Sequence, residues 1–158
     1  MLFHTVLASR NPTPNTTKQK CNTNHSRYLS TLPPDPYIYR SAHPLIITFH
    51  SYGAPLWTYS VEHVILDAVL DAVEHDDHEA INVTTLRYED VHSRTESAAL
   101  EMFFRSPMTW DGWSIVVDAL QKVFKGVYVN LVFEVAVALT PGKLRYIGPG
   151  RLYNPKDA

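Results

Sequence analysis

The side chains best placed to bind a ligand follow two segments expected to be strands and precede two expected helices. Tyr52, Gly53 and Trp57 follow the first segment, and Arg105, Ser106, Thr109 and Trp110 follow the second. The start of a helix has unpaired backbone N–H groups and the positive end of its dipole, which together can hold an anion or a carboxylate. We expect both loops to leave the sheet at the same edge, so the sequence predicts one ligand-binding pole there.

A purely structural role accounts for the same residues, and we favour it. In that interpretation Thr109 only caps its helix, the tryptophans close the core, and Arg105 pairs with an acid. Ligand sites are additions to a fold and do not follow from it. The pole is therefore the second of two hypotheses about function.

The histidines are the next candidates for chemistry. His75 and His78 are three residues apart, beside Asp76, Asp77 and Glu79. Imidazole and carboxylate groups are what a divalent metal ion needs, but a polar turn does not force them to converge on one point. We favour a solvated acidic turn, so no metal site is expected. His75 and His78 are the candidate ligands, with His63 and His92 nearby in the sequence.

Motifs for covalent or phosphate chemistry are missing. The sequence has no Gly-x-Ser-x-Gly elbow, no phosphate-binding loop and no Gly-x-Gly-x-x-Gly motif, and its single cysteine, Cys21, lies near the N-terminus. We expect no cofactor, and we favour a non-enzymatic protein.

Charge is unevenly distributed along the 158 residues. Residues 1–43 have a net charge of +4, and residues 44–158 have a net charge of −6. An acidic domain does not bind phosphate backbones readily, so we expect no nucleic-acid partner. No apolar run is long enough to cross a membrane, so no membrane partner is expected either.

Residues 1–43 are rich in Pro, Asn and Thr, and they predict a disordered basic tail, in which Tyr37-Ile38-Tyr39 is a candidate for an extended arm packed on the domain. A lone cysteine suits a reducing compartment, which favours an intracellular, cytoplasmic protein. The first 34 residues contain no acid and include Arg27-Tyr28-Leu29-Ser30, which looks like a processing site. Mitochondrial targeting is therefore a second hypothesis.

Residues 44–158 predict one α/β domain. β-branched and alternating runs predict strands over residues 45–52, 80–88, 98–105 and 128–139, with a short fifth strand over 144–147 that ends at Gly148-Pro149-Gly150. Two helices are expected between them, with Ser60 and Thr109 as N-caps and Gly126 after the second helix.

The resulting β-α-β-β-α-β order resembles the ferredoxin-like, split β-α-β architecture. That resemblance implies an α+β sandwich: an antiparallel sheet with both helices on one face and the extra C-terminal strand added. RNA-binding domains share this order, but Glu101 next to Phe103 argues against phosphate contacts.

One face of such a sheet is left without helices, and it is half apolar. Ile46, Val132, Ala136 and Ala138 are expected there, with Glu134 among them. Proteins seldom leave such a surface in water, so the tail, the fifth strand or a second subunit is expected to cover it. We therefore expect a binding or self-associating module, with a homo-oligomer through this face as the candidate assembly.

The sequence also resembles small uncharacterised proteins from filamentous fungi. The residues that carry the resemblance are Tyr52-Gly53, Thr109-Trp110 with Trp113, Phe133-Glu134-Val135 and Ile147-Gly148-Pro149-Gly150. The resemblance implies no activity and no catalytic residues.

Overall fold

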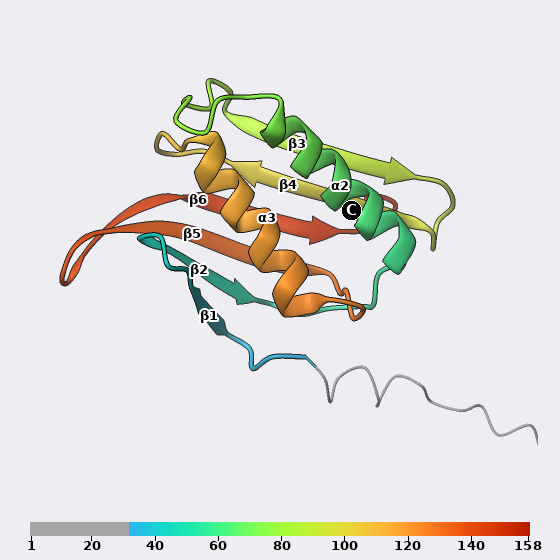
Figure 1. The fold of residues 1–158 in the computed structure, drawn as a ribbon. Coiled ribbons are helices and arrows are strands. Elements are labelled where there is room, and N and C mark those ends of the chain that lie inside the picture. Colours follow the sequence, from blue (N-terminus) through green and yellow to red (C-terminus); the bar gives the residue numbers. More distant parts are fainter. Residues whose placement is uncertain (1–31) are drawn as a thin grey trace, which may run out of the picture.

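The computed structural model describes residues 32–158, which form one six-stranded antiparallel sheet and two helices (Figure 1). The elements are β1 (Tyr37–Arg40), β2 (Leu45–His50), α2 (Thr58–Val73), β3 (Thr85–Val91), β4 (Ser97–Phe103), α3 (Trp110–Phe124), β5 (Leu131–Thr140) and β6 (Lys143–Tyr153). The strands lie side by side in the order β1-β2-β5-β6-β4-β3. The predicted α+β class with an antiparallel sheet is confirmed.

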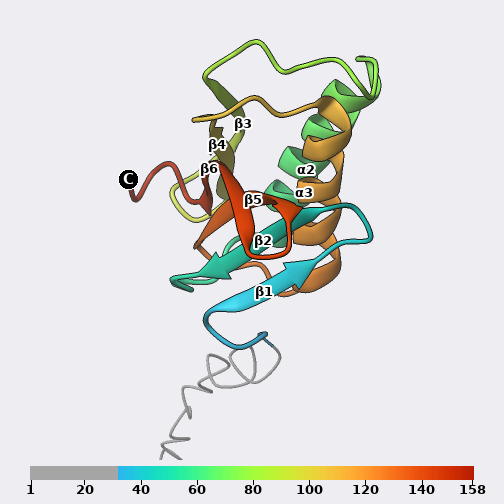
Figure 2. The same ribbon diagram turned by 90° about the vertical axis from the view of Figure 1, so that its left-hand side faces the viewer.

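Both helices lie on one face of the sheet, and Figure 2 shows the opposite face without a helix. α2 connects β2 to β3, and α3 connects β4 to β5. Each of these strand pairs is parallel, and the two connections cross the sheet in opposite directions. Crossovers of the same hand therefore place both helices on the same face.

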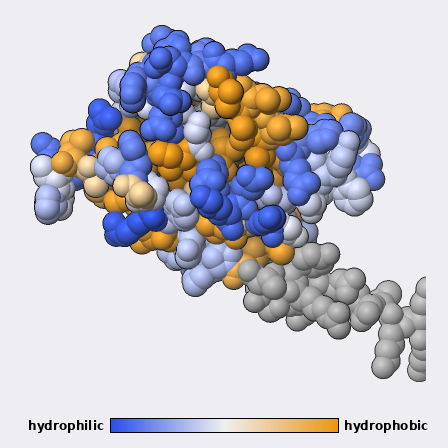
Figure 3. Space-filling view, viewed as in Figure 1, coloured by the Kyte–Doolittle hydropathy of each residue, from blue (hydrophilic) through white to orange (hydrophobic). Residues whose placement is uncertain are grey.

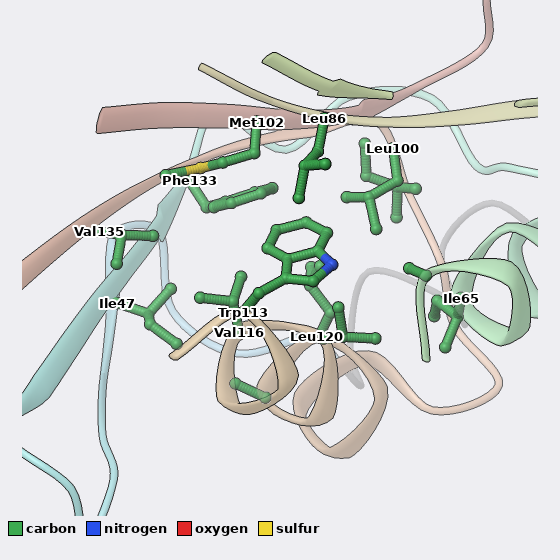
Figure 4. Packing of buried hydrophobic residues seen from close by; sticks show 14 of the residues in the cluster. Ile47, Ile65, Leu86, Leu100, Met102, Trp113, Val116, Leu120, Phe133 and Val135 are labelled. Atoms are coloured by element: carbon green, nitrogen blue, oxygen red, sulfur yellow. The ribbon is translucent and has the colours of Figure 1, made fainter. Parts of the chain in front are cut away.

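Trp113 of α3 occupies the centre of the core between helices and sheet (Figure 4). Its ring faces Leu100 and Met102 of β4, with Phe133 of β5 beside them. All four side chains are completely buried. Buried and outward-facing residues alternate along β2 and β5, as expected for a sheet covered on one face.

The strand order differs from the predicted ferredoxin-like arrangement. A split β-α-β unit places one strand between its two parallel strands, as β6 lies between β4 and β5. β2 and β3, however, are separated by β5, β6 and β4. The cause is the C-terminal hairpin, because β5 and β6 enter the sheet together between β2 and β4. The predicted short fifth strand is an eleven-residue strand in the middle of the sheet.

The Gly148-Pro149-Gly150 segment, predicted to end that strand, lies inside β6. A Cβ atom at position 148 would collide with the backbone oxygen of Phe103, and one at position 150 with the ring of Phe133. The glycines therefore allow β4 and the Phe133 ring to approach β6 closely. A bulge in β6 at Ile147, opposite the step from Val135 to Ala136 in β5, shifts the register beside this segment.

The N-terminal part of the described chain also belongs to the sheet. Residues 37–40, predicted to lie in the tail, form β1 and pair with β2 along its length. Cys21, the Arg27-Tyr28-Leu29-Ser30 segment and most of the predicted tail lie outside the described residues. No helix within residues 32–158 is both long and apolar enough to cross a membrane.

The predicted N-cap is correct for α3 and wrong for α2. α3 has the predicted cap, Thr109, and the chain turns at Gly126 with a positive φ of 77°. α2 instead begins at Thr58 with Trp57 as N-cap, because Ser60 is already buried in its first turn. Trp57 has no side-chain group that could accept a capping hydrogen bond.

An apolar patch covers the outer side of α2, visible in orange over this helix in Figure 3. Its residues are Leu66, Val69, Leu70 and Val73, of which Val73 is 75% exposed. Val69 and Val73 follow the buried Ala68 and Ala72 by one residue each in the apolar pattern of α2, yet both are exposed. They are exposed because α2 lies over the outer strands β3 and β4, with α3 on only one side (Figure 1).

Candidate functional site

The structure does not bring the predicted pole together. β2 and β4 run antiparallel to each other, since three antiparallel pairings separate them. Their C-terminal ends therefore lie at opposite edges of the sheet, each beside the start of a different helix (Figure 1). The expectation of one shared edge was wrong because it assumed the ferredoxin-like order, whereas the β5–β6 hairpin lies between β2 and β4 and leaves them antiparallel.

Tyr52 and Gly53 lie in the loop between β2 and the start of α2, and hydrogen bonds from both residues fix this loop. The Gly53 N–H donates to the backbone oxygen of Asn130 over 2.7 Å. The Tyr52 hydroxyl donates to the oxygen of Pro34 over 3.1 Å, and its ring packs edge-on against Phe124. Burial raises the pKa of Tyr52 to about 12, with Asp35 adding to the effect. Tyr52 thus remains a neutral anchor at physiological pH.

Thr109 and Trp110 lie at the other end, where the first turn of α3 is already satisfied. The Gly112 N–H donates to Thr109 Oγ1 over 3.3 Å, and the Trp110 N–H donates to the oxygen of Glu79 over 3.1 Å. Asp111 donates its N–H to the oxygen of Asp77 and adds a negative charge. This helix start therefore offers an anion few free donors.

Arg105 and Ser106 are near the start of α3, but they face different surroundings. Both backbone N–H groups donate to the oxygen of Ile147. The Arg105 guanidinium lies 5.9 Å from the centre of the Tyr146 ring. Arg105 has no carboxylate partner among residues 32–158, contrary to the predicted ion pair.

A cavity of about 360 Å³ opens beside the first turn of α3. Leu45, Val137 and Ile147 form its apolar wall, and Arg145 and His43 stand at its polar side. His43 lies 3.7 Å from Asp111, and both are partly exposed. Arg145 could pair with a small carboxylate here. This cavity could not be predicted from the sequence, because it depends on β6 lying next to β5.

The two candidate metal ligands have separate partners. The His75 ring stacks on Trp110 at 4.0 Å and lies near Asp71 and Glu79. His78 lines the cavity beside α3 instead. In the part of the chain that the structure describes, no group of three or more His, Cys, Asp or Glu side chains is arranged to hold a metal ion.

The helix-free face of the sheet divides into a charged half and an apolar half. In the charged half, Glu101 is only 6% exposed and accepts a hydrogen bond from Arg151 Nε over 2.7 Å. Arg87 lies 3.5 Å from its other oxygen and also pairs with Glu89. The Arg151 guanidinium stacks over Tyr153 at 4.1 Å. The charges in this half satisfy one another.

The apolar half, here called the apolar band, crosses five strands. It consists of Ile38 (β1), Ile46 (β2), Ala136 and Ala138 (β5), Leu144 and Tyr146 (β6), and Phe103 (β4). Ile46, Ala136 and Tyr146 are direct cross-strand neighbours. Leu144 is 58% exposed, Ile38 51%, Phe103 38% and Tyr146 37%. The sheet has a helix-free face that includes Ile46, Ala136 and Ala138, as predicted.

Glu134 lies within the apolar band, opposite Thr48 and Pro149. Burial raises the pKa of Tyr146, Glu134 raises it further, and Arg105 lowers it, so both charged groups lie close to this ring. Glu134 has no ion-pair partner among the described residues. Glu134 and Arg105 thus lie near the same ring and do not pair with each other.

Comparisons with known proteins find no relative of the chain. No family model, no curated protein and no solved structure matches the chain.

Proposed function

We propose that the domain is a non-enzymatic binding module that self-associates, with two copies meeting at the apolar band of the helix-free face. The observation that carries the proposal is the exposure of large apolar side chains along this band. A surface of this kind, next to a half whose charges are already paired, is typical of an interface.

The charges on the band favour a second copy of the chain as the partner. A two-fold axis places each part of this surface in one copy against another part of the same surface in the second copy. A charged surface can therefore pair with itself only if it carries both positive and negative groups. Glu134 and Arg105 both border Tyr146 and lack ion-pair partners within residues 32–158. Across a two-fold axis, Arg105 of one copy would meet Glu134 of the other.

The α2 patch is a weaker candidate for the same role. α2 carries Glu62, Asp67 and Asp71, and it has no lysine or arginine. Two copies of this surface would bring like charges together, which opposes association. The α2 patch therefore supplies the comparison that the experiment needs.

Light scattering after size-exclusion chromatography tests the proposal. The wild-type chain should change from monomer to dimer between about 1 and about 100 µM, the range for an interface of modest size. Phe103→Asp should remain a monomer throughout, and Leu66→Asp, the same change in a similarly exposed side chain of the α2 patch, should dimerise like wild type. A wild-type monomer over the whole range would refute the proposal, as would a Leu66→Asp monomer with a Phe103→Asp dimer.

A charge exchange tests the arrangement of the two copies. Glu134→Arg should weaken the dimer about tenfold or more by placing like charges together, and Glu134→Arg combined with Arg105→Glu should restore it. If the loss of dimer affinity in the double variant equals the sum of the losses in the two single variants, the proposed pairing is wrong.

We also propose that the chain is related to the small proteins of filamentous fungi that it resembles, and that it acts inside the cell. The residues at positions 52–53, 109–113 and 147–150 support the relationship. The single cysteine supports a reducing compartment, with the cytoplasm favoured over the mitochondrion.

A further inference from the structure

A groove of about 490 Å³ lies at the end of the molecule where α2 begins and α3 ends. The first turn of α2 forms one wall with Trp57, Thr58 and Tyr59, and the loop after α3 forms the other with Gly126 and Tyr128. Figure 1 shows both helix ends on the same side of the molecule. The groove shares no residue with the apolar band.

Three aromatic residues line the groove, and two of them are exposed to solvent. Trp57 is 49% exposed and Tyr59 56% exposed, whereas Tyr128 is buried. Trp110 and Trp113, the other tryptophans, are 6% and 0% exposed. Large, flat, exposed rings beside a buried one offer stacking surfaces for a ligand.

Hydrogen-bonding groups of both kinds surround these rings. α2 has no side-chain cap and no acid in its first turn. The backbone N–H groups of Thr58 and Tyr59 have no acceptor in the described chain, so they are available as donors. Glu62, one turn further along α2, supplies a carboxylate acceptor that also lines the groove.

The electrostatics of the groove are balanced. α2 points its positive end here and α3 its negative end, because the two helices run in opposite directions. The positive end of α2 disfavours a cation, and the Glu62 carboxylate disfavours an anion. A neutral ligand with an apolar face and several hydroxyl groups meets all of these conditions.

We propose that this groove binds a neutral saccharide. A sugar ring would lie against Trp57 or Tyr59 with its C–H face. Its hydroxyl groups would accept hydrogen bonds from the Thr58 and Tyr59 N–H groups and donate to Glu62. The site is independent of the proposed dimer interface, so either proposal can fail alone.

Tryptophan fluorescence offers a selective test on the full chain. Since Trp110 and Trp113 are buried, quenching by acrylamide reports mainly on Trp57. The probes are maltohexaose, cellohexaose and hexa-N-acetylchitohexaose, with choline chloride and hexagalacturonate as the cationic and anionic comparisons. At least one neutral hexasaccharide should reduce the quenching of Trp57 by half or more with a Kd on the order of 0.1 to 1 mM, a weak but specific affinity.

Variants locate the binding on the groove. Tyr59→Ala should weaken saccharide binding about tenfold by removing one stacking surface, and Glu62→Gln should weaken it a few-fold by removing the charged acceptor. Tyr146→Ala, which removes a similar ring from the apolar band, should leave saccharide binding unchanged. The proposal is overturned if no neutral hexasaccharide protects Trp57, if choline or hexagalacturonate protects it better, or if Tyr146→Ala and Tyr59→Ala have equal effects.

Discussion

At the scale of single residues, Gly148 and Gly150 determine how closely the middle of the sheet packs. Both positions face atoms that leave no space for a side chain: the Phe103 backbone at position 148 and the Phe133 ring at position 150. Phe133 is completely buried, so its ring cannot swing into solvent to make room. The same glycines looked like a turn signal in the sequence, because a glycine selected for close packing and one selected for a turn are identical in type.

Gly150→Ala should therefore lower the free energy of unfolding by about 2 kcal/mol or more, the cost of overpacking a core. Gly142→Ala is the control, since its Cβ meets no atom within 4 Å and only the positive φ of 80° is strained. It should cost only about 1 kcal/mol. Urea unfolding followed by circular dichroism measures both changes.

A double variant shows whether the Phe133 ring is the obstacle. Phe133→Leu with Gly150→Ala should lose less stability than the sum of the two single losses, because the smaller side chain makes room for the new methyl group. Strict additivity of the losses would show that Gly150 is needed for another reason.

At the scale of elements, sequence patterns predicted the features that depend on residues close together in the chain. The periodicity of residues 110–124, the Thr109 cap and the Gly126 turn describe α3 closely, because each acts within a few residues along the chain. The predicted strand over residues 80–88 begins only at Thr85, since Ala80 and Ile81 pair with the loop before α3 instead. Such pairing between distant loops leaves no periodic signal in the sequence.

The two helix starts give a matched pair of threonines for testing the role of capping. Thr109→Ala removes the acceptor of the Gly112 N–H and should cost about 1 kcal/mol of stability. Thr58→Ala is the same change in the first turn of α2, where no side-chain capping bond exists, so it should cost less than about 0.5 kcal/mol.

Thermal unfolding of both variants and of Thr109→Ser measures the difference. The serine variant keeps an accepting hydroxyl and should retain most of the stability. Equal losses in Thr109→Ala and Thr58→Ala would mean that the capping bond contributes nothing and that Thr109 matters for another reason.

At the scale of the whole molecule, the relative direction of the strands determines at which end of the sheet each candidate residue lies. Tyr52 and Arg105 each follow a strand and precede a helix, yet they lie at opposite edges because β2 and β4 run in opposite directions. The antiparallel pairing within β3–β4 and within β5–β6 could have been inferred from their short connections. The insertion of that last hairpin between β2 and β4 could not, since it depends on contacts between segments distant in sequence.

The helix-free face links the whole molecule's stability to its concentration. If two copies bind through the apolar band, only the folded chain can do so, and mass action stabilises the folded state as concentration rises. The melting temperature of the wild-type chain should then increase by about 4 °C for a hundredfold rise in concentration, as expected for a domain of this size. Phe103→Asp should melt at one temperature at every concentration, whereas Leu66→Asp should follow the wild type. A wild-type melting temperature that stays constant across this range would argue against a dimer even if a weak oligomer were seen on a column, because such an oligomer would not require the folded face.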